Sequence, residues 1–140
     1  MINGLSDEAH PCQALADLLA LKERFGDLSK VHLAYVGDGN NVCHSLMIGA
    51  ALSGMKMTVV TPQGFSPDAQ VLLNVQKIAA GTGAVLELSP HLSAAAGADA
   101  IYTDTWLSMG DKADPDVIER VFKPYQINTA VMQRLAVKYC

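Results

Sequence analysis

The length, composition and charge of the chain set the first limits on its class. With 140 residues, half of them hydrophobic, it can form one domain with a buried core but has no room for a second full domain. A formal net charge of -4 at pH 7 argues against a basic nucleic-acid-binding surface, and no stretch reaches the roughly 18 apolar residues of a membrane span. We expect small soluble molecules as partners, with no nucleic acid and no membrane.

The cysteines indicate the compartment. Cys12, Cys43 and Cys140 are odd in number and follow no C-x-x-C spacing, so they predict neither a disulfide framework nor a zinc site. We therefore expect a reducing, cytoplasmic location, with Cys12 and Cys43 as small buried residues. We also expect no metal site, because the remaining histidines are scattered singly along the chain as His32, His44 and His91.

The apolar pattern predicts alternating helices and strands. Spacings of three and four residues predict a first helix from Pro11 to Phe25, ended by Gly26. The expected strands that follow are 31–36, 56–61, 84–88 and 100–103. The expected helices between and after them are 42–53, 66–80, 92–96, 115–122 and 128–136.

This alternation indicates right-handed βαβ units and a parallel sheet. The fold class that we predict is α/β, a three-layer α/β/α sandwich around a Rossmann-like parallel sheet of about four strands. After the last helix the alternation calls for another strand, but only residues 137–140 remain. We therefore expect the sheet to lack its final edge strand.

Polar residues after the strand at 100–103 predict a ligand site at the carboxyl end of the sheet. Asp104, Ser108 and Met109 follow this strand, and Asn40 and Asn41 follow the first strand. A carboxylate can hold an ammonium group and amides can hold a carboxylate, so the set suits a zwitterionic ligand. The alternative is structural, since an aspartate or asparagine at these places can simply cap a helix.

The glycine-rich turn at 37–41 resembles a dinucleotide fingerprint only superficially. Val42 occupies the third glycine position, and Asp38 would bring negative charge to a phosphate. We expect no nucleotide and no other cofactor.

Residues at the start of the first helix could act on a carbonyl group. His10 and Gln13 lie at the amino terminus of the predicted helix, where they can donate to or polarise a carbonyl oxygen. The alternative for His10 is a capping role. No base is spaced to activate Cys12 as a nucleophile.

Together these stretches resemble the aspartate/ornithine transcarbamylase family, and within it the ornithine carbamoyltransferases. The matching motifs are Asn-Gly-Leu-Ser-Asp at 3–7, His-Pro-Cys-Gln at 10–13, Gly-Asp-Gly-Asn-Asn at 37–41 with His-Ser at 44–45, Thr-Asp-Thr-Trp-Leu-Ser-Met-Gly at 103–110 and Tyr-Gln-Ile-Asn at 125–128. They run nearly end to end, and together they are far more specific than any one alone.

The resemblance implies an enzyme of one-carbon transfer, from carbamoyl phosphate to L-ornithine, that yields L-citrulline and phosphate without a metal or cofactor. It implies that His10 and Gln13 contact the carbamoyl group. It further implies that ornithine is bound by Asn41, Asp104, Ser108 and Met109. Such a site orients an amine against a polarised carbonyl and stabilises the developing oxyanion.

The family's phosphate-clamping Ser-Thr-Arg-Thr-Arg loop and its His-Cys-Leu-Pro segment are both missing from these 140 residues. We therefore expect the ornithine-binding portion of such an enzyme, inactive as an isolated chain and with no complete catalytic set. Residues 1–29 are expected as an interdomain-type helix carrying the 10–13 motif, and residues 30–140 as the ornithine-binding domain. Two alternatives are a non-catalytic remnant or interaction module, and a transcarbamylase for another amine such as putrescine.

The state of assembly follows from the same reasoning. The family is homotrimeric, largely through a domain that these residues do not contain. The resemblance therefore does not imply that this chain forms the trimer. A sheet that lacks its edge strand exposes unpaired backbone groups and an apolar flank, so we expect self-association.

Overall fold

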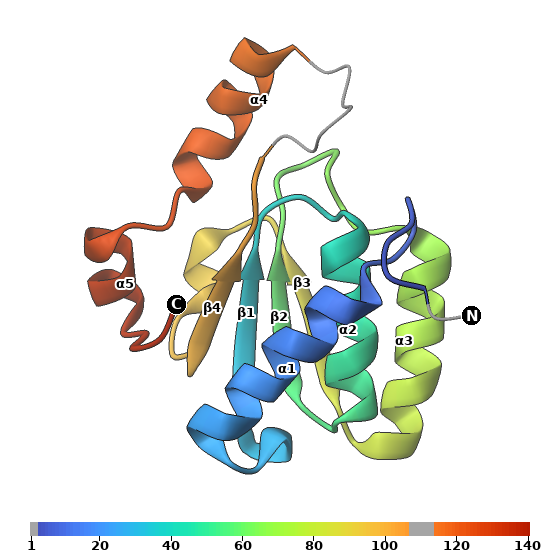
Figure 1. Cartoon of the computed structure of the whole chain (residues 1–140). Coiled ribbons are helices and arrows are strands. Elements are labelled where there is room, and N and C mark those ends of the chain that lie inside the picture. The colour runs from blue at the N-terminus through green and yellow to red at the C-terminus, as the bar shows by residue number, and fades with distance from the viewer. Residues whose placement is uncertain (1–2, 107–113) are drawn as a thin grey trace.

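Four parallel strands form the sheet of the computed structural model, which describes residues 3–106 and 114–140 (Figure 1). Their order in the described part is β3-β2-β1-β4, and all three pairings are parallel. The strands are β1 (His32–Val36), β2 (Lys56–Val60), β3 (Val85–Ser89) and β4 (Ala100–Thr103). The predicted α/β class with a parallel, Rossmann-like sheet is confirmed.

The helices begin and end within three residues of their predicted bounds. They are α1 (Pro11–Phe25), α2 (Asn41–Leu52), α3 (Ala69–Thr82), α4 (Pro115–Phe122) and α5 (Thr129–Leu135). The expected short helix at 92–96 is a 3₁₀ helix, η2 (Leu92–Ala95), because four residues close too few α-type hydrogen bonds. Two further 3₁₀ turns, which the periodicity did not predict, are η1 (Leu28–Lys30) and η3 (Lys123–Tyr125).

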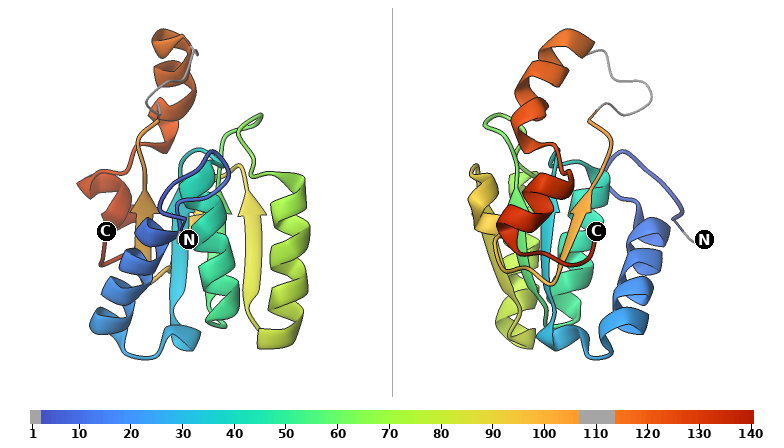
Figure 2. Two further views of the ribbon diagram at one scale, coloured as in Figure 1. Left: turned by 45° about the vertical axis from the view of Figure 1, so that its right-hand side comes forward. Right: turned by 90° about the vertical axis from the view of Figure 1, so that its left-hand side faces the viewer.

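Helices cover both faces of the sheet, as Figure 2 shows. Helices α1, α2 and α3 lie on one face, whereas η2 and α5 lie on the other. Neighbouring residues of β1 alternate between the two layers, so that Leu33 and Tyr35 enter the first core and Ala34 and Val36 the second. The predicted three-layer arrangement is therefore present.

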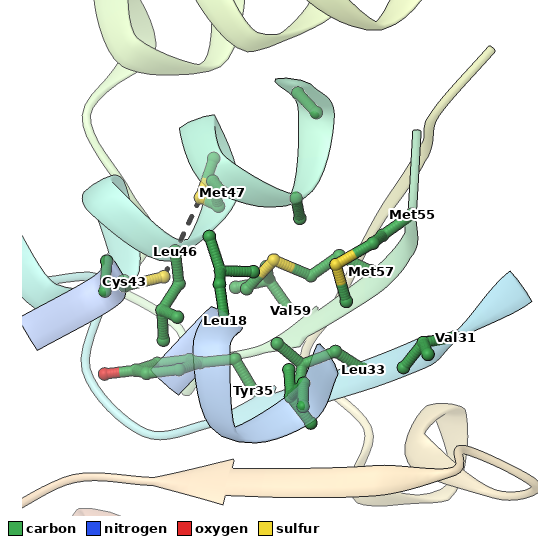
Figure 3. Close-up of a cluster of buried hydrophobic side chains, with 14 of the residues drawn as sticks. Leu18, Val31, Leu33, Tyr35, Cys43, Leu46, Met47, Met55, Met57 and Val59 are labelled. Atoms are coloured by element: carbon green, nitrogen blue, oxygen red, sulfur yellow. Dashed lines mark hydrogen bonds between the residues drawn. The ribbon is translucent and has the colours of Figure 1, made fainter. Parts of the chain in front are cut away.

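The larger core, drawn in Figure 3, lies between the sheet and α2. Met47, Met55 and Met57 are almost fully buried there, and their unbranched side chains fill the space between helix and strands. Helix α1 packs closely on α2 because residue 49 is glycine: a Cβ at Gly49 would lie 2.5 Å from Leu18 Cδ1. The buried face of α1 thus belongs to the same core as the sheet.

The end of the chain lies beside the outer edge of β4. Tyr139 forms an isolated parallel bridge with Ala100, and the Ile101 amide donates to the Tyr139 carbonyl at 2.9 Å. The Tyr139 ring also packs edge-to-face on Phe25, with centroids 6.0 Å apart. In the described part, only this one bridge occupies the place where a further strand was expected.

The strand order locates the site. From β1 the chain proceeds to β2 and β3 on one side, and β4 then pairs with β1 on the other side. The loops after β1 and β4 therefore diverge at the carboxyl edge of the sheet, which is the usual ligand position in open α/β sheets.

Gly39, in the turn after β1, is required by a close backbone approach. Its amide donates to the Phe65 carbonyl at 2.8 Å, and a Cβ at this position would overlap the backbone of Ser66 and Pro67. The glycine therefore seats the β1–α2 turn against the β2–α3 loop. No phosphate is needed to explain it.

We expect Gly39→Ala to lower the free energy of unfolding by about 1–3 kcal/mol, because the backbone of two loops must separate. Gly81→Ala is the matched control: Gly81 lies in α3, a Cβ at this position would meet nothing within 4 Å, and helix propensity favours alanine. Urea denaturation of both variants measures the effect. Equal stability of the two variants would contradict the role assigned to Gly39.

Candidate functional site

A side-chain hydrogen bond joins the loops that follow β1 and β4. Asn40 Nδ2 donates to Asp104 Oδ2 at 3.0 Å, across 64 residues of sequence. Asn40 Oδ1 caps α2 by accepting from the amides of Val42 and Cys43 at 3.0 and 3.1 Å. The other oxygen of Asp104 accepts from the Thr105 amide at 2.7 Å. Asn40 thus caps the helix and orients the Asp104 carboxylate at the same time.

Two stacked tyrosines lie beneath this bond. Tyr35 and Tyr102, on neighbouring strands in register, stack with ring centroids 5.9 Å apart. The Tyr35 hydroxyl donates to the Asp38 carbonyl at 2.8 Å, which fixes the turn that presents Asn40. Burial raises the pKa of Tyr35, which is completely enclosed, so its hydroxyl stays protonated.

Asn41 takes a different role from its neighbour. It is the first residue of α2, and its Nδ2 donates to the Ser6 carbonyl at 2.8 Å. The expectation of a helix cap therefore holds for Asn40 and not for Asn41. An amide nitrogen carries two hydrogens, so one donor position of Asn41 is left by this bond.

Two more α2 side chains hold the segment that precedes α1. The Ser45 hydroxyl accepts from the His10 amide at 2.9 Å, and His44 Nδ1 lies 3.1 Å from the Glu8 carbonyl. His44 Nε2 accepts from the Asp68 amide at 3.1 Å, so Nδ1 must carry the proton that is donated to Glu8. Positions 41, 44 and 45 share one helix face, which clamps residues 6–10.

This clamp places His10 and Gln13 at the start of α1. His10 occupies the position before the helix, but its side chain makes no capping bond, and its Nδ1 is enclosed without a partner in the described part of the chain. Gln13 Nε2 donates to Asp17 Oδ1 at 2.9 Å, one helical turn further along α1. His10 is thus the N-cap residue of α1 by position, but its side chain does not cap the helix.

Asp17 and Tyr102 connect the two parts of the site. Burial raises the pKa of Asp17, and the nearby Asp104 raises it further, against lowering effects from Gln13, Tyr102 and His10. Burial and the two carboxylates raise the pKa of Tyr102 to about 12. Residues from α1, β4 and the loop after β4 are thus electrostatically coupled.

The described residues contain four of the six predicted site residues, His10, Gln13, Asn41 and Asp104. Ser108 and Met109 lie outside the described residues. Sequence reasoning missed Asp17, Tyr102 and the anchoring role of His44. For Asp17 the sequence offered one signal, its spacing of four residues from Gln13 on the same helix.

Trp106 has a packing role, the more common one for this residue type. Its ring stacks on Phe122 of α4 with centroids 6.1 Å apart, and Phe122 in turn meets Phe65 edge-to-face at 4.8 Å. These contacts attach α4 to the carboxyl edge of the sheet.

One cysteine prediction was wrong. Cys43 is buried as expected, and burial raises the pKa of its thiol. Cys12, expected to be buried, is exposed because α1 turns Ala14, Leu18 and Leu21 toward the core instead. The described residues contain no group of three or more metal-ligating side chains and no helix long and apolar enough to cross a membrane.

Comparison with known proteins identifies the family of the chain. The family model "Aspartate/ornithine carbamoyltransferase, Asp/Orn binding domain" matches residues 29–139. The ornithine carbamoyltransferase of Shewanella oneidensis is 52% identical over 134 residues, which cover 96% of this chain and 44% of that protein.

Solved structures show the same similarity. The ornithine carbamoyltransferase from Pyrococcus furiosus superimposes with a TM-score of 0.90 at 42% identity, covering 99% of this chain and 46% of its own. The enzyme from Gloeobacter violaceus gives a TM-score of 0.84 at 44% identity, covering 99% and 47%. The chain spans less than half the length of these relatives. Because the Asp/Orn binding domain model matches most of the chain and the fold agrees, the chain belongs to the aspartate/ornithine carbamoyltransferase family.

Proposed function

We propose that the chain is the ornithine-binding portion of an ornithine carbamoyltransferase, which acts in arginine biosynthesis or in ornithine and citrulline metabolism. The observation that carries this proposal is the Asn40–Asp104 bond at the carboxyl edge of the sheet, which orients a carboxylate that can pair with an ammonium group. The relatives named ornithine carbamoyltransferase support the same substrates, L-ornithine and carbamoyl phosphate.

Each predicted site residue has a proposed contact. The α-ammonium of ornithine pairs with Asp104, and the remaining N–H of Asn41 Nδ2 donates to its α-carboxylate. Ser108 and Met109 close over the same amino-acid head group. His10 and Gln13 contact the carbamoyl group from the start of α1.

The mechanism proposed is orientation of two substrates and stabilisation of charge. The neutral side-chain amine of ornithine attacks the carbamoyl carbon, the bond from that carbon to the phosphate oxygen breaks, and the departing phosphate takes the proton that the amine loses and leaves as hydrogen phosphate. A His10 N–H donates to the carbamoyl oxygen, where negative charge develops in the transition state. No protein nucleophile takes part, which agrees with the buried thiol of Cys43.

Within the chain, residues 1–29 and 30–140 have separate proposed tasks. The first segment carries His10 and Gln13 toward a carbamoyl phosphate domain, and the second binds ornithine. Their contact through α1 and α2 supports a fixed distance between the two substrates.

Location and assembly are also proposals. All three cysteines are free, which supports a reducing, cytoplasmic compartment. The outer edge of β4 is paired only at Tyr139 in the described part, which supports self-association of the isolated chain.

The isolated chain should show no carbamoyl transfer. Nothing in its 140 residues reproduces the arginine-rich loop that neutralises the phosphate charge in this family. Loss of even one preorganised donor costs about 10²–10³-fold in rate, so loss of the loop should leave no measurable activity. Colorimetric citrulline assay of the purified chain with both substrates tests this. Citrulline formation well above a buffer blank would show the inactivity prediction to be wrong.

Ornithine should bind weakly and through Asp104. Because a hydrogen-bonded charged partner contributes about 1.5–3 kcal/mol, Asp104→Ala should weaken binding by roughly tenfold or more. Titration calorimetry at high protein concentration measures this, with the exposed Asp116→Asn as the control. Putrescine, which lacks the α-carboxylate, should bind more weakly than ornithine. Binding of ornithine that survives Asp104→Ala would place the ligand elsewhere.

A further inference from the structure

The hydrogen bond between Gln13 and Asp17 decides which end of the Gln13 amide faces the site. A carboxylate only accepts hydrogen bonds, so the amide nitrogen must point to Asp17, as the 2.9 Å distance from Nε2 to Oδ1 shows. The carbonyl oxygen Oε1 is then turned away from Asp17. Gln13 therefore has Oε1 available as an acceptor, beside the one N–H of Nε2 that the bond to Asp17 does not use.

Asp17 is itself held by groups from several elements. The Tyr102 hydroxyl of β4 interacts with the carboxylate, His10 attracts it from the start of α1, and Asp104 repels it from the loop after β4. Its Oδ2 is enclosed without a hydrogen bond of standard geometry in the described part, as is His10 Nδ1. Two unsatisfied polar atoms in one small region leave unused hydrogen-bonding capacity beside Gln13.

The charged Asp17 carboxylate does not stabilise the folded chain. Burial raises its pKa, which means that folding disfavours the charged form. An amide or an apolar side chain at position 17 would avoid that cost. The charge is therefore better explained by what it does to its neighbours.

We propose that Asp17 is a positioning residue that fixes the Gln13 amide so that Oε1 accepts from the amino group of the carbamoyl substrate. This inference deepens the proposed function and rests on it for the identity of the substrate. The carbamoyl group presents an N–H donor that an acetyl group of similar size lacks. Asp17 thus sets a preference for a carbamoyl over an acyl phosphate.

The first test follows the Gln13 side-chain amide by ¹⁵N–¹H NMR as the pH is lowered. Protonated Asp17 can donate to Oε1, so the Gln13 amide resonances should shift with a midpoint above 3.8, the ordinary value for aspartate. Asp17→Asn should remove this inflection, whereas Asp104→Asn should retain it. A Gln13 inflection that persists in Asp17→Asn would overturn the proposal.

Stability gives a second readout that separates positioning from a structural role. A raised pKa in the folded chain favours the protonated form, so this stabilisation is present below 3.8 and is lost as pH rises through the folded pKa. Asp17→Asn imitates the neutral form, and its Tm should equal or exceed that of the wild type at pH 7, with the difference vanishing at low pH. A markedly lower Tm at pH 7 would assign Asp17 a structural role instead.

A comparison of carbamoyl phosphate with acetyl phosphate tests whether the orientation of the Gln13 amide affects substrate binding. Because the chain lacks the phosphate-clamping loop, both ligands should bind weakly, but carbamoyl phosphate should still bind about tenfold more tightly than acetyl phosphate, as one added hydrogen bond predicts. Asp17→Asn should bring this ratio toward one. A wild-type ratio near one, or an unchanged ratio in the variant, would contradict the substrate preference. If Gln13 responds to pH but ornithine binding does not depend on Asp104, the positioning role is supported while the proposed function fails.

Discussion

The bond from Asn40 to Asp104 joins the two loops that diverge from neighbouring strands, and the arrangement of the site depends on it. A parallel sheet with the order β3-β2-β1-β4 brings these loops together but does not by itself orient their side chains. Asn40 does so because one amide caps α2 with its oxygen and holds the carboxylate with its nitrogen. The position of a whole helix and the direction of one charge are thereby linked.

Helix α2 organises the other half of the site through its first turns. Its apolar face fills the core under the sheet, while Asn41, His44 and Ser45 hold the backbone of the segment before α1. The groups at the start of α1 are consequently placed relative to the sheet by hydrogen bonds as well as by packing. These hydrogen bonds fix the backbone of residues 6–10, which their own sequence would not do.

Much of the fold was predictable because its signals are local. Apolar spacing, glycines and caps placed the principal helices and strands, and their alternation gave the parallel sheet. Errors occurred where a residue's neighbour comes from another element. Cys12 is exposed because α1 packs through Ala14, Leu18 and Leu21. Gly39 proved to be a contact between two loops, which the sequence pattern around it does not contain.

The sequence by itself determined the fold class, the order of elements and the presence of an aspartate and paired asparagines at the carboxyl edge of the sheet. Only the tertiary structure decided how the asparagines divide their roles, since Asn40 meets Asp104 and Asn41 meets Ser6. It alone also brought Asp17 against Tyr102 and thereby joined α1 to β4. The physical reason is that periodicity reports burial along one element, whereas hydrogen-bond partners depend on atoms brought together by the whole fold.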